Sequence, residues 1–158
     1  MHMGGRTAKQ PGKATVKQAK FVFLDTAYAN ALINTRDQWH ERAVVWQERL
    51  AKERRPLLST EFVLVEIADG LAAVQFRKHA MQMIDLLKEN PFVEIVSLSS
   101  ELFEEAFKLY KKRTDKGWGL TDCTSFIVMQ RYGVIDALTT DEHFQQAGFR
   151  ALLLQEEM

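Results

Sequence analysis

Short apolar runs alternate with segments of helical periodicity along this chain. Residues 21–24 are apolar without a helical period and are followed by an acid, which is typical of a buried strand. Between residues 39 and 53 apolar positions recur every three to four residues, which predicts one buried face of a helix. The same reasoning predicts further strands at 57–60, 92–98, 134–138 and 149–154, and further helices at 26–33, 61–71, 76–90, 100–113, 122–132 and 142–147.

Strands that alternate with helices predict the α/β class, with a central parallel sheet of about five strands covered by helices on both faces. Right-handed crossovers bring the carboxyl ends of parallel strands to one edge, where ligands bind in such folds. A length of 158 residues suits one domain. We expect that domain at residues 21–158, after an N-terminal arm at residues 1–20.

The net charge of zero conceals an asymmetry. Residues 1–20 carry five basic side chains and no acid, whereas residues 21–158 carry 16 basic and 21 acidic side chains, a net charge of −5. We expect a flexible basic arm, with contact to nucleic-acid phosphates as the alternative. The single cysteine, Cys123, excludes an internal disulfide and a cysteine-based zinc site and suits the cytoplasm. No apolar run is long enough to span a membrane, and we expect none.

Four carboxylates occupy unusual positions in this pattern. Asp25 and Asp141 follow predicted strands directly, Glu66 lies within an apolar helical run, and Asp122 lies in the first turn of a helix. Each acid alone has a simpler explanation, because acids commonly cap helices or compensate the helix dipole. A glutamate buried in an apolar helix is harder to explain, because it needs a partner.

Carboxylates that gather at one edge repel one another, and none of the four has a lysine or arginine next to it in sequence. A divalent cation relieves that repulsion, and Mg²⁺ and Mn²⁺ prefer oxygen ligands. The sequence therefore predicts an all-oxygen metal site, open to a substrate, that is formed by Asp25, Glu66, Asp122 and Asp141.

These acids and their neighbours resemble the PIN domain family of metal-dependent nucleases, particularly the VapC-type toxins of prokaryotic toxin–antitoxin pairs. The matching stretches are Phe23-Leu24-Asp25-Thr26, Ser59-Thr60 through Val65-Glu66 with Gly70-Leu71, Leu120-Thr121-Asp122, and Leu138-Thr139-Thr140-Asp141-Glu142-His143-Phe144. The likeness covers residues 21–154. It implies a three-layer α/β/α sandwich, a Mg²⁺ or Mn²⁺ site at the four acids, and endonucleolytic cleavage of RNA.

The resemblance also implies supporting residues and partners. Thr139 matches the hydroxyl that supports the first aspartate, and Thr26 is a weaker candidate for a similar role. An antitoxin protein and a second copy of the chain are the implied partners, and apolar stripes on the helices at 39–53 and 76–90 offer a groove for a partner helix. Core packing of those stripes is the alternative.

The chain offers no evident nucleophile, so we expect hydrolysis by an activated water that leaves a 5′-phosphate and a 3′-hydroxyl. Cys123 lacks a histidine partner, and His143 is expected at the surface or at a helix cap, with substrate contact as the less favoured alternative. Residues 111–116 have two interpretations. Their basic side chains form either a basic lip near Asp122 or simply a solvated helix end.

Two rival functions remain open at this point. A haloacid dehalogenase phosphatase needs a second aspartate two residues after the first, and Ala27 occupies that position. The remaining rival is a catalytically silent PIN-like module that binds RNA or protein. The presence of all four acids argues against such a loss of activity.

Overall fold

The computed structural model describes residues 21–155, and its centre is a five-stranded sheet in which every neighbouring pair of strands is parallel. The strands are β1 (Val22–Leu24), β2 (Leu57–Thr60), β3 (Val93–Val96), β4 (Asp136–Leu138) and β5 (Arg150–Ala151). Their order across the sheet is β3-β2-β1-β4-β5. The predicted arm at residues 1–20 lies outside the described residues.

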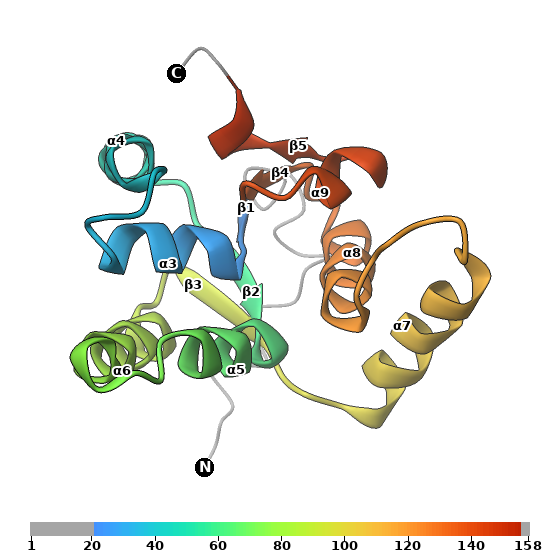
Figure 1. Ribbon diagram of the computed structural model, residues 1–158. Coiled ribbons are helices and arrows are strands. Elements are labelled where there is room, and N and C mark those ends of the chain that lie inside the picture. Colours follow the sequence, from blue (N-terminus) through green and yellow to red (C-terminus); the bar gives the residue numbers. More distant parts are fainter. Residues whose placement is uncertain (1–20, 156–158) are drawn as a thin grey trace.

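Helices cover both faces of this sheet. They are α3 (Thr26–Ile33), α4 (His40–Glu53), α5 (Glu61–Gly70), α6 (Val74–Glu89), α7 (Ser100–Lys112), α8 (Leu120–Tyr132) and α9 (Glu142–Gln146). Helices α3, α4 and α6 lie on one side of the sheet, and α7 and α8 lie on the other (Figure 1). The predicted three-layer α/β architecture is therefore confirmed.

The helix starts that bear on the site follow local capping chemistry. The Thr60 hydroxyl accepts a hydrogen bond from the Val63 N–H at 3.0 Å, so α5 begins directly after β2. Ser99 caps α7 in the same way through the Leu102 N–H, also at 3.0 Å. Gly133 ends α8 with a φ of 66°, a left-handed conformation that glycine adopts without steric cost.

Aromatic packing fixes α8 and α9 against the centre of the sheet. Phe23 of β1, Phe126 of α8 and Phe144 of α9 are among the largest fully buried side chains. The rings of Phe126 and Phe144 meet edge to face with centroids 5.0 Å apart, which is a favourable aromatic geometry. This contact holds the start of α9 close to the carboxyl ends of β1 and β4.

Two predicted elements differ from the structure. The strand predicted at 149–154 is a two-residue strand followed by a 3₁₀ helix at Leu152–Leu154, in which Leu152 and Leu153 are buried. The helix predicted at 122–132 begins at Leu120, because the Asp122 carboxylate accepts the Gly119 N–H at 3.0 Å and Gly119 becomes the cap. Thr121 therefore lies within the first turn of the helix.

Candidate metal centre

Asp25 directly follows the carboxyl end of β1, and its side chain is almost fully buried there. Only 8% of its surface is exposed. The Thr139 hydroxyl donates a hydrogen bond to Oδ2 of Asp25 at 2.7 Å, and the same hydroxyl accepts the Asp141 N–H at 3.0 Å. Thr139 thus connects the end of β1 to the segment after β4, which is the supporting role that the family resemblance implies.

Burial raises the pKa of Asp25 to about 7. The hydrogen bonds from Thr139 and from the Thr26 backbone lower the pKa, and the negative charges of Asp122 and Glu66 raise it further. Asp25 therefore interacts electrostatically with two of the other predicted acids. A buried carboxylate that has other negative charges nearby is stabilised when a cation binds beside it.

Glu66 reaches this centre from α5, but the expectation that it is buried was wrong. Val63, Leu64 and Ile67 form the buried face of α5, and Glu66 lies on its exposed side. Apolar neighbours in sequence do not make a burial site here, because residues adjacent in a helix point in different directions. The Thr26 hydroxyl donates to Oε1 of Glu66 at 2.8 Å and ties the side chain to the start of α3.

Asp122 and Asp141 meet at a histidine that the sequence pattern did not assign to the site. Nδ1 of His143 lies 3.1 Å from Oδ2 of Asp122 and 3.3 Å from Oδ1 of Asp141. One ligand atom from each of these three side chains lies within 4.8 Å of the others. Asp141 also caps α9 through the His143 N–H at 2.8 Å, and this turn places His143 beside its own cap residue.

The four predicted acids are not one cluster of ligand atoms, because Asp122 and Asp141 meet at His143 while Asp25 and Glu66 lie outside that group and are linked to it indirectly. Thr139 links Asp25 to Asp141, His143 links Asp141 to Asp122, and the charges of Asp122 and Glu66 both act on Asp25. We call Asp25, Glu66, Asp122 and Asp141 the acidic centre. Their hydrogen-bonding and ionic partners within residues 21–155 are hydroxyl groups, backbone N–H groups and one imidazole.

Cys123 is next to Asp122 in sequence but is not suited to act as a nucleophile. It is fully buried, and burial together with the charge of Asp122 raises the pKa of its thiol to about 11. The thiol is therefore protonated at neutral pH, and the thiolate is the reactive form.

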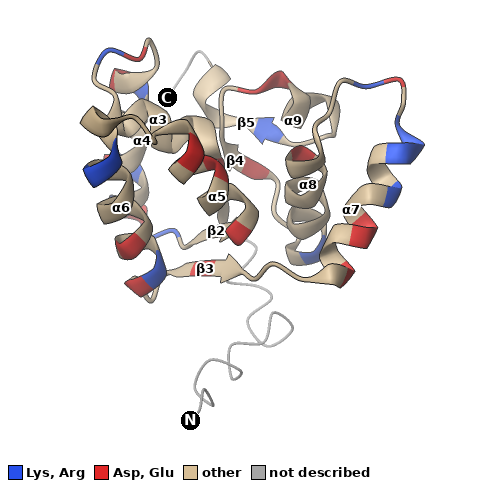
Figure 2. Ribbon diagram, turned by 60° about the horizontal axis from the view of Figure 1, so that its bottom comes forward, with Lys and Arg blue, Asp and Glu red and all other residues tan. Residues whose placement is uncertain are grey.

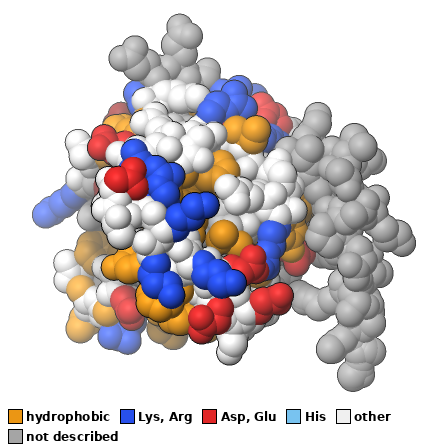
Figure 3. Space-filling model, turned by 90° about the vertical axis from the view of Figure 1, so that its right-hand side faces the viewer, with side chains coloured by type: hydrophobic (Ala, Val, Ile, Leu, Met, Phe, Trp, Pro, Cys, Tyr) orange, Lys and Arg blue, Asp and Glu red, His pale blue; other side chains and the backbone are white. Residues whose placement is uncertain are grey.

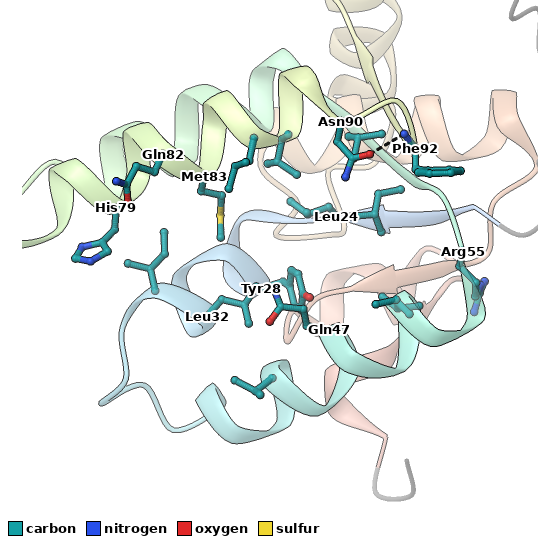
Figure 4. A pocket seen from close by; sticks show the side chains of 18 of the residues that line it. Leu24, Tyr28, Leu32, Gln47, Arg55, His79, Gln82, Met83, Asn90 and Phe92 are labelled. Carbon is teal, nitrogen blue, oxygen red and sulfur yellow. Dashed lines mark hydrogen bonds between the residues drawn. The ribbon is translucent and has the colours of Figure 1, made fainter.

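A cavity among the described residues lies elsewhere, between α4 and α6. It has a volume of about 1060 Å³ and is lined mostly by apolar side chains, among them Leu32, Leu50, Met83 and Leu86. Figure 4 shows Tyr28 and Leu32 on α3 at its floor, with Gln47 and Met83 contributed by α4 and α6. Of the regularly spaced apolar positions in the stripes predicted at 39–53 and 76–90, only Leu50, Met83 and Leu87 line this groove, whereas Ala43, Trp46 and Ala80 are buried in the core, as the alternative of core packing expects.

Comparison with known proteins identifies the class that this fold and centre define. Residues 22–150 match the PIN domain family, and the chain belongs to that family. Within it, the chain is similar to the 23S rRNA-specific endonuclease VapC20 of Mycobacterium tuberculosis, strains CDC 1551 / Oshkosh and ATCC 25618 / H37Rv. The identity to each is 25% over 128 residues, which is 81% of this chain and 95% of the relative.

A solved structure agrees with this placement. The crystal structure of Mycobacterium tuberculosis VapC20, described as a Sarcin-Ricin loop cleaving toxin, superimposes with a TM-score of 0.71 and 25% identity. The match covers 82% of this chain and 96% of that one. In the part of the chain that the structure describes, no helix has the length and apolar character needed to cross a bilayer.

Proposed function

We propose that this protein is a metal-dependent endoribonuclease and the toxin of a toxin–antitoxin pair. The observation that supports this most strongly is the acidic centre itself, in which Asp122 and Asp141 meet at His143 and the charges of Asp122 and Glu66 act on the buried Asp25. Within residues 21–155, no lysine or arginine forms an ion pair with any of them. Carboxylates that lie near one another without a lysine or arginine are best stabilised by a metal ion.

The donor set fits Mg²⁺ or Mn²⁺. Asp25, Asp122 and Asp141 supply carboxylate oxygens at the edge of the sheet, and Glu66 supplies another from α5. His143 lies close enough to Asp122 and Asp141 to add a nitrogen, which Mn²⁺ accepts more readily than Mg²⁺. A bound divalent cation would neutralise these carboxylates and the scissile phosphate and would activate a water for hydrolysis.

The side chains around the acids keep them in place. Thr139 fixes the Asp25 carboxylate, Thr26 fixes Glu66, and His143 lies between Asp122 and Asp141. Such supporting hydrogen bonds orient the groups that hold a metal and are worth about 10- to 100-fold in affinity or activity.

The substrate and partners follow from the relatives. VapC20 is named as a 23S rRNA-specific endonuclease and as a Sarcin-Ricin loop cleaving toxin, and we propose a structured RNA loop as the substrate class of this chain. We further propose that an amphipathic antitoxin segment binds the groove between α4 and α6, that two copies of the chain associate, and that the protein acts in the cytoplasm.

A cleavage assay tests the proposed function. The purified protein is incubated with a hairpin RNA of the sarcin–ricin loop sequence in Mn²⁺, in Mg²⁺ and in EDTA, alongside Asp122→Asn and the control Asp85→Asn, which changes an exposed acid on α6. We expect metal-dependent cleavage to 5′-phosphate ends by the wild type and the control, and none by Asp122→Asn. Binding without cleavage under every condition would favour the silent module instead.

A further inference from the structure

The C-terminal half of α7 and the loop that follows it form the most basic segment of an otherwise acidic domain. Residues 108–116 contain five basic side chains and one acidic one, a net charge of +4, whereas residues 21–158 together carry −5. Figure 2 shows acidic positions at the other end of α7 and basic ones at this end. The five basic residues are Lys108, Lys111, Lys112, Arg113 and Lys116.

Aromatic side chains accompany these charges along one face of α7. Phe103, Phe107 and Tyr110 are spaced by four and three residues, and successive ring centroids lie 6.0 Å and 6.1 Å apart. Tyr110 is 46% exposed and Phe103 is 39% exposed. Nζ of Lys111 lies 4.6 Å from the centroid of the Phe107 ring. Figure 3 shows basic and hydrophobic side chains interspersed on this side of the molecule.

The loop after α7 runs from this surface to the acidic centre. The Arg113 guanidinium lies 5.0 Å from the centroid of the Trp118 ring, and the Trp118 indole N–H donates to Gln146 of α9 at 3.0 Å. A methyl group placed on Gly117 would lie 3.8 Å from Nε2 of His143. The basic segment therefore ends beside the residues that would hold the metal.

We propose that RNA flanking the cleaved bond binds along residues 107–116, a surface that we call the α7 strip. This inference rests on the proposed function and extends it to the path of the substrate. Lys111, Lys112 and Lys116 pair with successive phosphates, and an unpaired base stacks on Tyr110. Positive charge that tracks the backbone, with exposed rings for the bases, is the pattern of single-stranded RNA binding.

RNA fits this surface better than a second copy of the chain. A symmetric contact centred on the α7 strip would bring two segments of +4 together, and like charges disfavour such pairing. RNA phosphates complement that charge. The α7 strip also ends beside the acidic centre. A surface that binds the RNA on either side of the cleaved bond must do so.

The test measures RNA binding separately from cleavage. Fluorescence anisotropy of the labelled hairpin RNA is recorded in EDTA at salt concentrations from about 50 to about 300 mM. The dependence of binding on salt measures the contribution of ionic contacts. The variants are Lys111→Gln/Lys112→Gln/Lys116→Gln and Tyr110→Leu. The charge-matched control is Lys52→Gln/Lys78→Gln/Lys88→Gln, which changes three exposed lysines on α4 and α6. Thermal unfolding verifies that each variant is folded, and light scattering reports the molar mass.

Losing three phosphate contacts is expected to reduce the slope of log K against log salt by about two and to weaken binding about 100-fold at 0.1 M salt. Tyr110→Leu should weaken binding at least about fivefold with the slope unchanged, because a stacked base loses its ring. Equal effects of the two lysine triples would overturn the proposal. A molar mass that falls only in the α7 strip variants would also overturn it and assign the surface to a second copy. Because binding is measured in EDTA, it does not depend on the metal, so binding in EDTA together with no cleavage by the wild type in Mn²⁺ or Mg²⁺ contradicts the proposed function alone.

Discussion

Replacing Asp25 with asparagine should stabilise the metal-free protein at alkaline pH. Burial raises the pKa of this carboxyl from 3.8 to about 7, so its charged form is disfavoured in the folded chain. A tenfold change in an acid constant is worth about 1.4 kcal/mol, so the charge costs up to about 4 kcal/mol at pH 8. Asparagine carries no charge and keeps an oxygen that can accept the Thr139 hydroxyl.

The sign of the pH dependence follows from the same pKa. Between about pH 4 and pH 7 the folded chain binds the Asp25 proton more tightly than the unfolded chain does, so stability falls as the pH rises through this window. Below pH 4 Asp25 is protonated in both states, and the asparagine variant gains nothing. We expect it to recover about 1–3 kcal/mol at pH 8, which raises the melting temperature by about 3–10 °C for a domain of this size.

Circular dichroism melts of wild type and Asp25→Asn in EDTA at pH 4 and pH 8 measure this difference. Adding Mn²⁺ at pH 8 should reverse the order, because only the wild type keeps the full set of ligands and is stabilised by binding. A variant that is less stable than the wild type at pH 8 in EDTA would refute the reasoning. A difference that is equal at both pH values would refute it too, because the charge of Asp25 would then play no part.

Three further substitutions follow, two beside the acidic centre and one at the start of β4. Thr139→Val removes the hydroxyl that Asp25 accepts, so we expect about 10- to 100-fold less cleavage activity and a higher Asp25 pKa by NMR titration; unchanged values would exclude the supporting role. His143→Asn should weaken Mn²⁺ binding by calorimetry more than Mg²⁺ binding, because it removes an imidazole; equal losses would place His143 outside the ligand set. Asp136→Ala removes the buried carboxylate that pairs with Arg55 and Arg150 and should cost about 1–3 kcal/mol in urea unfolding; a neutral result would show that these two ion pairs add no stability.

Much of the fold could be predicted because the apolar runs and the helical periods are local signals. The run at 21–24 and the acid after it placed β1 and Asp25 correctly, and the helix predicted at 61–71 begins where α5 does. The two-residue β5 could not be predicted, because a leucine-rich run has the same composition in a short strand and in a buried 3₁₀ turn.

Part of the acidic centre could be predicted from the sequence in the same way. Strand ends in a parallel sheet share an edge, so the pattern correctly brought Asp25 and Asp141 together. The exposed side of α5, on which Glu66 lies, depends on how that helix packs, which its own sequence does not determine. For His143, substrate contact was the less favoured alternative, because Asp122 is 21 residues away and only the packing of α8 on α9 brings the two side chains together.

Anomalous diffraction from a crystal soaked in Mn²⁺ tests the central claim most directly. A shared metal site predicts a manganese peak among the carboxylates of Asp25, Asp122 and Asp141, with Glu66 facing it from α5. A fully soaked crystal whose acidic centre holds no manganese would contradict that claim.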